Sequence, residues 1–279
     1  MNELPLVFFT VLGQMGAGTV LMTSLYSLIC KQTTSVIKIM RINTVALIIM
    51  ALAMIIASFH LGHPLRALNV IFGIGRSPMS NEIFTFGILF SVTFISVLLT
   101  YFSQPDNGNR LQLLKKLTHK INHIPGMAKL LALVLIIVSL FFIWTIVATY
   151  MLTTVKNWDT PYTVLQMYST MLILGGVTIT VFGIRKLGII CFTIGSIIVL
   201  TTKLPYIHFV SGITPDLAQA QYCFWLIQCG TLGIALIITF INSFKCGKST
   251  AIYAAVAILA LVGELSGRIA FYNLWAIPM

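Results

Sequence analysis

LLALVLIIVSLFFIWTIVAT, residues 130–149, runs for twenty positions without a charged side chain. A helix of that length spans about 30 Å, which is the thickness of the hydrocarbon core of a bilayer. Similar apolar runs recur along the whole chain. Of its 279 residues, 58% are hydrophobic and 8% are charged, against roughly 25% charged in a soluble domain. The sequence therefore predicts an integral membrane protein.

The number of apolar runs predicts an all-α bundle of eight transmembrane helices, in which residues 1–279 form a single membrane domain. The first run begins directly after Glu3, without a basic segment or a small-residue cleavage site, so we expect it to be retained as a span. No segment between the runs is long enough for a soluble domain. The expected spans are 5–30, 40–60, 82–102, 128–150, 164–185, 187–210, 218–243 and 249–275.

Lysine and arginine are distributed unequally between the two sides of the predicted bundle. Twelve of them follow odd-numbered spans, four follow even-numbered spans, namely Arg66, Arg76, Lys156 and Lys203, and Arg268 lies inside the eighth span. Basic residues near the ends of spans stay in the cytoplasm, so both termini are predicted to face outward. The net charge of +11 is then explained by contact with anionic lipid, and a nucleic-acid partner is not expected.

The five cysteines lie in or beside the spans and do not cluster with one another or with histidine. Disulfide frameworks and iron–sulfur sites need such clusters. The sequence therefore predicts no metal site in this protein.

The connection between the second and third spans holds the densest chemistry. His60 ends one predicted helix and Glu82 opens the next, so a simple hairpin brings both side chains to the same depth, with Arg66 in the loop between them. An imidazole beside a carboxylate is suited to proton transfer. The alternative for Glu82 is a structural role in the first turn of a helix that Ser80 caps, and the alternative for His60 is a simple interfacial hydrogen bond.

A second group of charged residues lies in the last span. Glu264 and Arg268 are four positions apart, which predicts that they pair on one helix face and thereby lower the cost of burial. Gly263 and Gly267 flank the acid and would allow another helix to approach closely. Tyr272, together with Trp275, is assigned to the aromatic belt at the membrane surface.

Four blocks of sequence resemble DmsC, the membrane anchor subunit of bacterial anaerobic dimethyl sulfoxide reductase. The resemblance extends from the first span to the last and is weakest in spans four to seven. The blocks are PLVFFTVLGQ at 5–14, the pattern His-Leu-Gly-x-Pro-x-Arg-Ala-x-Asn at 60–69, SNEI at 80–83, and Gly-Glu-x-x-Gly-Arg-x-x-Phe-Tyr at 263–272.

The resemblance implies a subunit of the bacterial inner membrane that oxidises menaquinol during anaerobic respiration and holds an iron–sulfur subunit and a molybdopterin catalytic subunit to the membrane. In that family the residues matching His60 and Glu82 serve menaquinol binding and oxidation. Arg66 would orient them or contact the iron–sulfur partner, and Glu264 and Arg268 would support the site. The protein itself would carry no haem, metal or cluster. His63 departs from the family pattern, which leaves open a second imidazole in proton transfer.

Two other classes of protein also explain buried charges. A proton- or ion-coupled transporter places them at the bilayer midplane in helices broken by glycine or proline, whereas the spans here lack interior proline at that depth. A haem-binding cytochrome b would need two facing axial ligands, for which His60 and His208 are the candidates.

Overall fold

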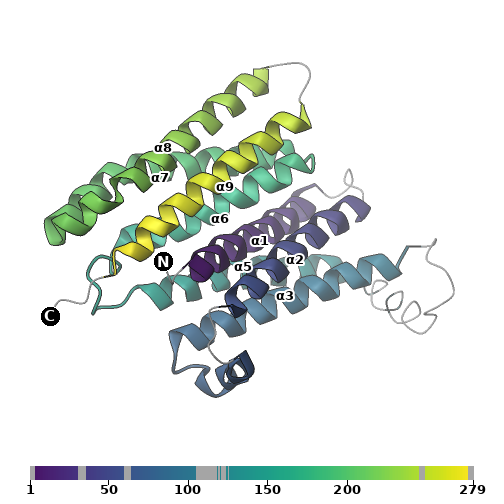
Figure 1. Ribbon diagram of the computed structural model, residues 1–279. Helices are drawn as coiled ribbons and strands as arrows, with labels where there is room; N and C mark the ends of the chain where they lie inside the picture. Colours follow the sequence, from purple (N-terminus) through teal and green to yellow (C-terminus); the bar gives the residue numbers. More distant parts are fainter. Residues whose placement is uncertain are drawn as a thin grey trace.

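The computed structural model describes residues 4–30, 36–59, 64–104, 118, 120, 124, 126–244 and 249–275, the side chains of 64–68 and 244 excepted. In this part of the sequence, eight helices are long and apolar enough to cross a membrane (Figure 1). A short 3₁₀ helix, η1 (Pro64–Gly73), lies between the second and third of them. The eight are α1 Leu4–Ile29, α2 Val36–Ser58, α3 Pro78–Phe102, α5 Met127–Tyr150, α6 Pro161–Val181, α7 Arg185–Ile213, α8 Pro215–Phe244 and α9 Thr250–Asn273.

These helices confirm the predicted all-helical bundle of eight spans, although several begin earlier than the apolar runs. Three helices start at a proline, namely Pro78, Pro161 and Pro215. Proline has no backbone N–H and is pre-set for the first turn of a helix, where that N–H would have no intrahelical partner. Each of these helices therefore extends a few residues beyond its hydrophobic stretch. The outward orientation of the termini stays a prediction.

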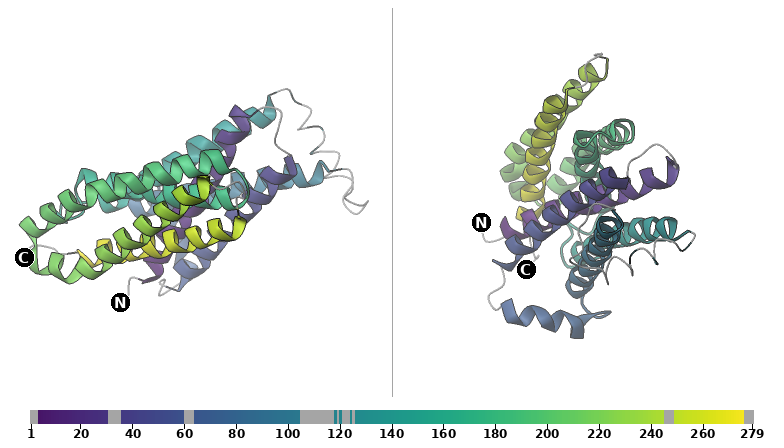
Figure 2. Two further views of the ribbon diagram at one scale, coloured as in Figure 1. Left: turned by 90° about the horizontal axis from the view of Figure 1, so that it is seen from above. Right: turned by 90° about the vertical axis from the view of Figure 1, so that its right-hand side faces the viewer.

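The bundle consists of two groups of four helices. Helices α1, α2, α3 and α5 pack together, and α6, α7, α8 and α9 form the second group. Figures 1 and 2 show the two groups side by side. The main contact between them is made by α1 against α6, and α9 adds contacts to α1. The helices of this junction carry Gln14, Thr170, Glu264 and Arg268, which are buried.

The α1–α6 contact depends on two glycines that face each other. A Cβ placed on Gly175 would lie 2.5 Å from the carbonyl carbon of Gly18, and a Cβ on Gly18 would collide with the backbone oxygen of Met171. Small residues let membrane helices approach closely, and the gain is van der Waals contact along the crossing. The two halves of the bundle are thus held at the closest approach that backbones permit.

We expect Gly175→Ala to destabilise the protein by about 1–3 kcal/mol, because the added methyl group forces the two helices apart. Thermal unfolding in detergent measures the change. Gly87→Ala is the matched control, since Gly87 also lies inside a helix but has open space around its Cα. An unchanged melting temperature for Gly175→Ala would contradict the close contact.

The course of α7 bears on two expectations from the sequence. Lys203 does not lie in a loop, because α7 continues past it to Ile213, and its side chain is buried. Pro205 lies inside the same helix, but in its C-terminal half rather than at its middle, so the expectation of spans without proline at the midplane is not contradicted. A proline within a helix removes one backbone hydrogen bond, which costs stability unless packing compensates. The predicted charge asymmetry becomes stronger, since Lys203 no longer counts on the outer side.

Candidate functional site

Four charged side chains of the described residues are buried, and each is at most 4% exposed. They are two acids, Glu82 on α3 and Glu264 on α9, and two bases, Lys203 on α7 and Arg268 on α9. Charges in an apolar medium need partners, because desolvation costs several kcal/mol per ion. The partners of each therefore define what the site can do.

Glu264 lies between two cations and reaches each through one neutral side chain. On one side, Gln228 donates its Nε2 to Glu264 Oε1 at 3.2 Å, and its Oε1 accepts from Lys203 Nζ at 2.7 Å. On the other side, Thr170 donates its hydroxyl to Glu264 Oε2 at 2.5 Å and accepts from Arg268 Nη2 at 3.1 Å. The carboxylate is thus compensated from both sides.

This arrangement corrects the predicted direct pair of Glu264 with Arg268. Helix α6 packs against α9 and places Thr170 between the two side chains. Arg268 turns instead toward α1, where its Nη2 donates to Gln14 Oε1 at 2.7 Å. Its Nη1 contacts the sulfur of Met167 on α6. Arg268 therefore ties α1, α6 and α9 together at the junction of the two halves.

The glycines around Glu264 make room for α8, as the sequence suggested. A Cβ on Gly263 would lie 2.5 Å from Thr231 Oγ1, and a Cβ on Gly267 would overlap the carboxamide of Gln228. Gln228 can therefore reach Glu264 only because position 267 has no side chain. The two glycines therefore have two roles. They let α8 and α9 pack closely, and they leave room for Gln228 to bind Glu264.

Glu82 has a different environment and no role as a helix cap. Helix α3 begins at Pro78 after Ser77, with no side-chain cap, so Glu82 lies beyond the first turn and Ser80 caps nothing. Both expectations for these residues were wrong, because the proline moves the helix start outward. Glu82 is 3% exposed, and its Oε1 has no hydrogen-bond partner.

Several polar groups lie close enough to Glu82 to act on its charge. They include the hydroxyl of Thr149 and the guanidinium of Arg268. One turn further along α3, the hydroxyl of Thr85 lies 2.8 Å from that of Thr145 on α5 and fixes the α3–α5 contact. The carboxylate of Glu82 thus faces the interior of the bundle with one oxygen free to take a further partner.

Two tyrosines connect the surroundings of Glu82 with the last helix. The Tyr272 hydroxyl donates to the Tyr150 hydroxyl at 2.6 Å and lies 3.5 Å from Thr10 Oγ1 on α1. Tyr272 is buried, so its assignment to the aromatic belt was wrong, whereas Trp275 is 57% exposed as a belt residue would be. The difference arises because α9 turns the face with Tyr272 toward α1 and α5.

The indole of Trp158 packs against the buried C-terminal end of α9. Trp158, in the α5–α6 connection, stacks on the Phe271 ring with centroids 5.3 Å apart, and its Nε1 donates to the Phe271 backbone oxygen at 2.8 Å. These contacts fix the C-terminal end of α9, which carries Tyr272 and Arg268.

His60 and the side chain of Arg66 lie outside the described residues, as does His63. Helix α2 ends at Ser58 and α3 begins at Pro78. Within the connection, the backbone N–H of Gly75 donates to Asn81 Oδ1 at 2.7 Å, which fastens the end of the loop to the start of α3. The structure joins Glu264 to Arg268 through one threonine, and Arg268 lies near enough to Glu82 to act on its charge. Whether His60 joins them stays a prediction.

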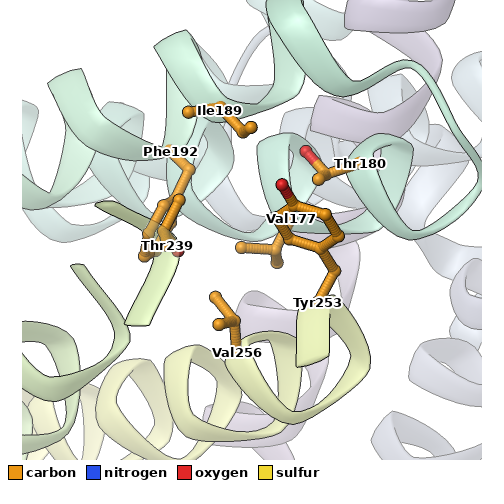
Figure 3. A pocket seen from close by; sticks show the side chains of 7 residues that line it. All are labelled: Val177, Thr180, Ile189, Phe192, Thr239, Tyr253 and Val256. Carbon is orange, nitrogen blue, oxygen red and sulfur yellow. The ribbon is translucent and has the colours of Figure 1, made fainter. Parts of the chain in front are cut away.

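Two cavities lie among α6, α7, α8 and α9. One has a volume of about 10 Å³, roughly the space of a single water molecule, and its polar lining includes Thr170, Gln228, Glu264 and Arg268. The other is shown in Figure 3, and most of the side chains that line it are apolar, including the ring of Phe192 and the side chains of Val177 and Val256. It has no room for a water molecule. Only the first is suited to exchange protons through water.

Several residues of the network were not singled out from the sequence as site residues. Each of them is a polar side chain within a long apolar run, which the sequence does show. Which groups such a side chain binds depends on which helices pack against its own. The residues concerned are Gln14, Tyr150, Thr170, Lys203 and Gln228.

A bundle of eight apolar helices with acids and bases joined inside it defines a multi-pass membrane protein whose polar chemistry lies within the bundle. The protein belongs to the family of DMSO reductase anchor subunits (DmsC), whose family model matches residues 1–274. This confirms the resemblance seen in the sequence. An anchor subunit implies catalytic and electron-transfer partner subunits in one complex.

Three relatives match nearly the whole sequence. The YnfH subunit of an anaerobic dimethyl sulfoxide reductase of Escherichia coli (strain K12) is 27% identical, and the match spans 98% of this protein and 95% of that one. The C subunit of the Haemophilus influenzae anaerobic dimethyl sulfoxide reductase is 26% identical over 98% of this protein and 94% of its own length. The C subunit of the Escherichia coli (strain K12) anaerobic dimethyl sulfoxide reductase is 26% identical over 98% of this protein and 95% of its own length.

Proposed function

We propose that this anchor subunit binds menaquinol, oxidises it, and passes the electrons to an iron–sulfur partner subunit of a dimethyl sulfoxide reductase-type complex. The observation that carries the proposal is the buried carboxylate of Glu82, whose Oε1 has no hydrogen-bond partner among the described residues. Buried polar atoms are normally hydrogen-bonded, and the hydroxyl of a bound quinol would supply the donor that this oxygen lacks. The location we propose is the bacterial inner membrane, with both termini in the periplasm.

The chemistry of a quinol matches the residues proposed for the site. Oxidation of one menaquinol to menaquinone releases two electrons and two protons. His60 would accept a hydrogen bond or proton from one hydroxyl, and Glu82 would carry protons toward the outer surface. Arg66 would orient these groups or contact the iron–sulfur subunit. The electrons leave for the iron–sulfur partner, and from there reach the molybdopterin catalytic subunit.

The buried network behind Glu82 supports the site rather than contacting the quinol. Arg268 links the surroundings of Glu82 to Thr170, and Thr170 binds Glu264. This series keeps the guanidinium near enough to Glu82 to offset part of the desolvation that burial imposes on the carboxylate. Glu264 and Arg268 are accordingly positioning residues. That the protein itself carries no haem, metal or cluster stays a prediction.

A transporter remains the alternative, and one feature favours it. The hydrogen-bonded series Lys203–Gln228–Glu264 lies deep in the second group of helices, and Pro205 follows Lys203 within α7. Broken helices with buried charges are typical of transporters. Membership of an anchor-subunit family favours the quinol site.

Purification from detergent provides a direct test of the partner subunits. We expect the full-length protein, tagged and produced in its own cells under anaerobic growth, to bring molybdenum and iron with it. Elemental analysis of the eluate measures both. A protein that is stable and folded but retains neither element would contradict the anchor function and favour the transporter.

We expect Glu82→Gln to slow menaquinol oxidation by about 100-fold, because the amide cannot carry a proton but still fills the same space. The assay follows oxidation of a reduced quinol analogue by the assembled complex and the binding of a quinone-site inhibitor. Asp216→Asn is the matched control, since Asp216 is an exposed acid in the first turn of α8. If Glu82→Gln changes assembly alone, its role is structural.

A further inference from the structure

A basic pocket lies at the opposite end of the bundle from Asp159 and Trp158. It has a volume of about 490 Å³ and is lined by Ile37, Lys38, Arg41, Ile42 and Phe182. Its walls come from the start of α2 and from the residue after α6, so two elements from different halves of the bundle form it. The charge distribution predicts that this end faces the cytoplasm.

The two cations of the pocket, Lys38 and Arg41, have no ion pair with an acid among the residues that the structure describes, and Lys38 is held by a backbone oxygen. Lys38 Nζ donates to the backbone oxygen of Gly183 at 3.0 Å, which anchors the lysine over the α6–α7 turn and leaves its remaining N–H groups available. Arg41 follows one turn later on α2 and is exposed. Both lie in the first two turns of α2, where the positive end of the helix dipole adds to their charge.

The acidic residues of the described part of the sequence all lie elsewhere. Glu82 and Glu264 are buried in the network of the candidate site. Asp159 precedes α6, whereas Phe182 follows it, so the length of that helix, about 30 Å, separates them. Asp216 begins α8 at the same far end as Asp159. These four acids therefore do not neutralise the positive charge of the pocket, which is suited to an anionic ligand.

The apolar side chains indicate which anion would bind. Phe182 and Ile37 are 38% and 39% exposed beside the two cations. Below Arg41, the exposed residues Ile48, Leu52 and Ile55 follow at spacings of seven, four and three, which places them on the same stripe of α2. A phosphate group at Lys38 and Arg41 would thus have an apolar track directly beneath it. Free phosphate gains nothing from such a track, whereas an acyl chain does.

We propose that this pocket binds the phosphodiester headgroup of an anionic glycerophospholipid, with Lys38 and Arg41 contacting the phosphate and an acyl chain lying along Ile48 and Leu52. Basic pockets between membrane helices on the cytoplasmic side recognise such headgroups. The bound lipid would connect the two halves of the bundle at the end away from the quinol site. This inference is independent of menaquinol oxidation.

Native mass spectrometry of the purified complex tests the proposal. With phosphatidylglycerol added, we expect the wild-type complex to retain it in preference to phosphatidylcholine. Lys38→Gln and Arg41→Gln should each weaken retention about 5-fold, and the double variant about 25-fold. Arg41→Lys keeps the charge and should retain the lipid. Lys186→Gln is the matched control, since Lys186 is exposed at the same end of the bundle but does not line the pocket.

Two results would overturn the proposal. Equal retention by the wild-type complex and a folded double variant would show that the two cations do not bind the headgroup. Displacement of the lipid by excess inorganic phosphate, with equal occupancy by phosphate alone, would show that the pocket takes a soluble anion. A lipid that resists phosphate and is lost with the two cations supports the site.

Discussion

His60→Ala is expected to lower menaquinol-dependent electron delivery by at least about 100-fold, the smallest contribution typical of a positioned proton-transfer group. The expectation rests on the sequence block at 60–69, which lies in a protein that belongs to the DmsC family. Alanine removes the imidazole but leaves the loop and its neighbours. Assembly with the partner subunits should therefore stay intact.

The measurement is the rate at which a reduced menaquinol analogue delivers electrons through the purified complex. His208→Ala is the matched control, because His208 is an exposed histidine on α7 and should leave the rate unchanged. His63→Ala reports whether a second imidazole shares the proton transfer. Wild-type rates in a fully assembled His60→Ala complex would refute the role of His60.

Arg268→Met is expected to reduce the free energy of unfolding by about 3–5 kcal/mol, which is the usual effect of removing one partner of a buried charge network. The guanidinium donates to Gln14 and Thr170, and through Thr170 it compensates Glu264. Methionine fills similar space but leaves those acceptors without a donor. Thermal or denaturant unfolding in detergent measures the loss, and Arg76→Gln, an exposed arginine, should change it by less than about 0.5 kcal/mol.

A double variant separates the charge effect from simple packing. Combining Arg268→Met with Glu264→Gln removes both charges. The loss of unfolding free energy in the double variant should therefore be smaller than the sum of the losses in the two single variants. Strict additivity would mean that Thr170 does not couple the two groups. Quinol oxidation should also fall in Arg268→Met, because Glu82 loses its nearby cation.

The sequence predicted the eight spans because a membrane helix must satisfy its own backbone hydrogen bonds and be apolar for about 20 residues. That requirement is local, so it is visible in a single sequence. The helix ends were less certain, since Pro78 and Pro215 extend helices beyond the apolar run. Likewise, Lys203 was counted with the outer loops although the predicted span 187–210 contains it, and the structure places it inside α7.

The sequence also identified Glu82, Glu264 and Arg268, because an ionisable group within an apolar run stands out without any knowledge of its neighbours. What it could not give was the partner of each group. Arg268 and Gln14 are 254 positions apart, and Thr170 is 94 positions from Glu264. Such pairs exist only once α1, α6 and α9 pack together. The local pattern thus determined which residues are costly to bury, and helix packing alone decided which residues compensate them.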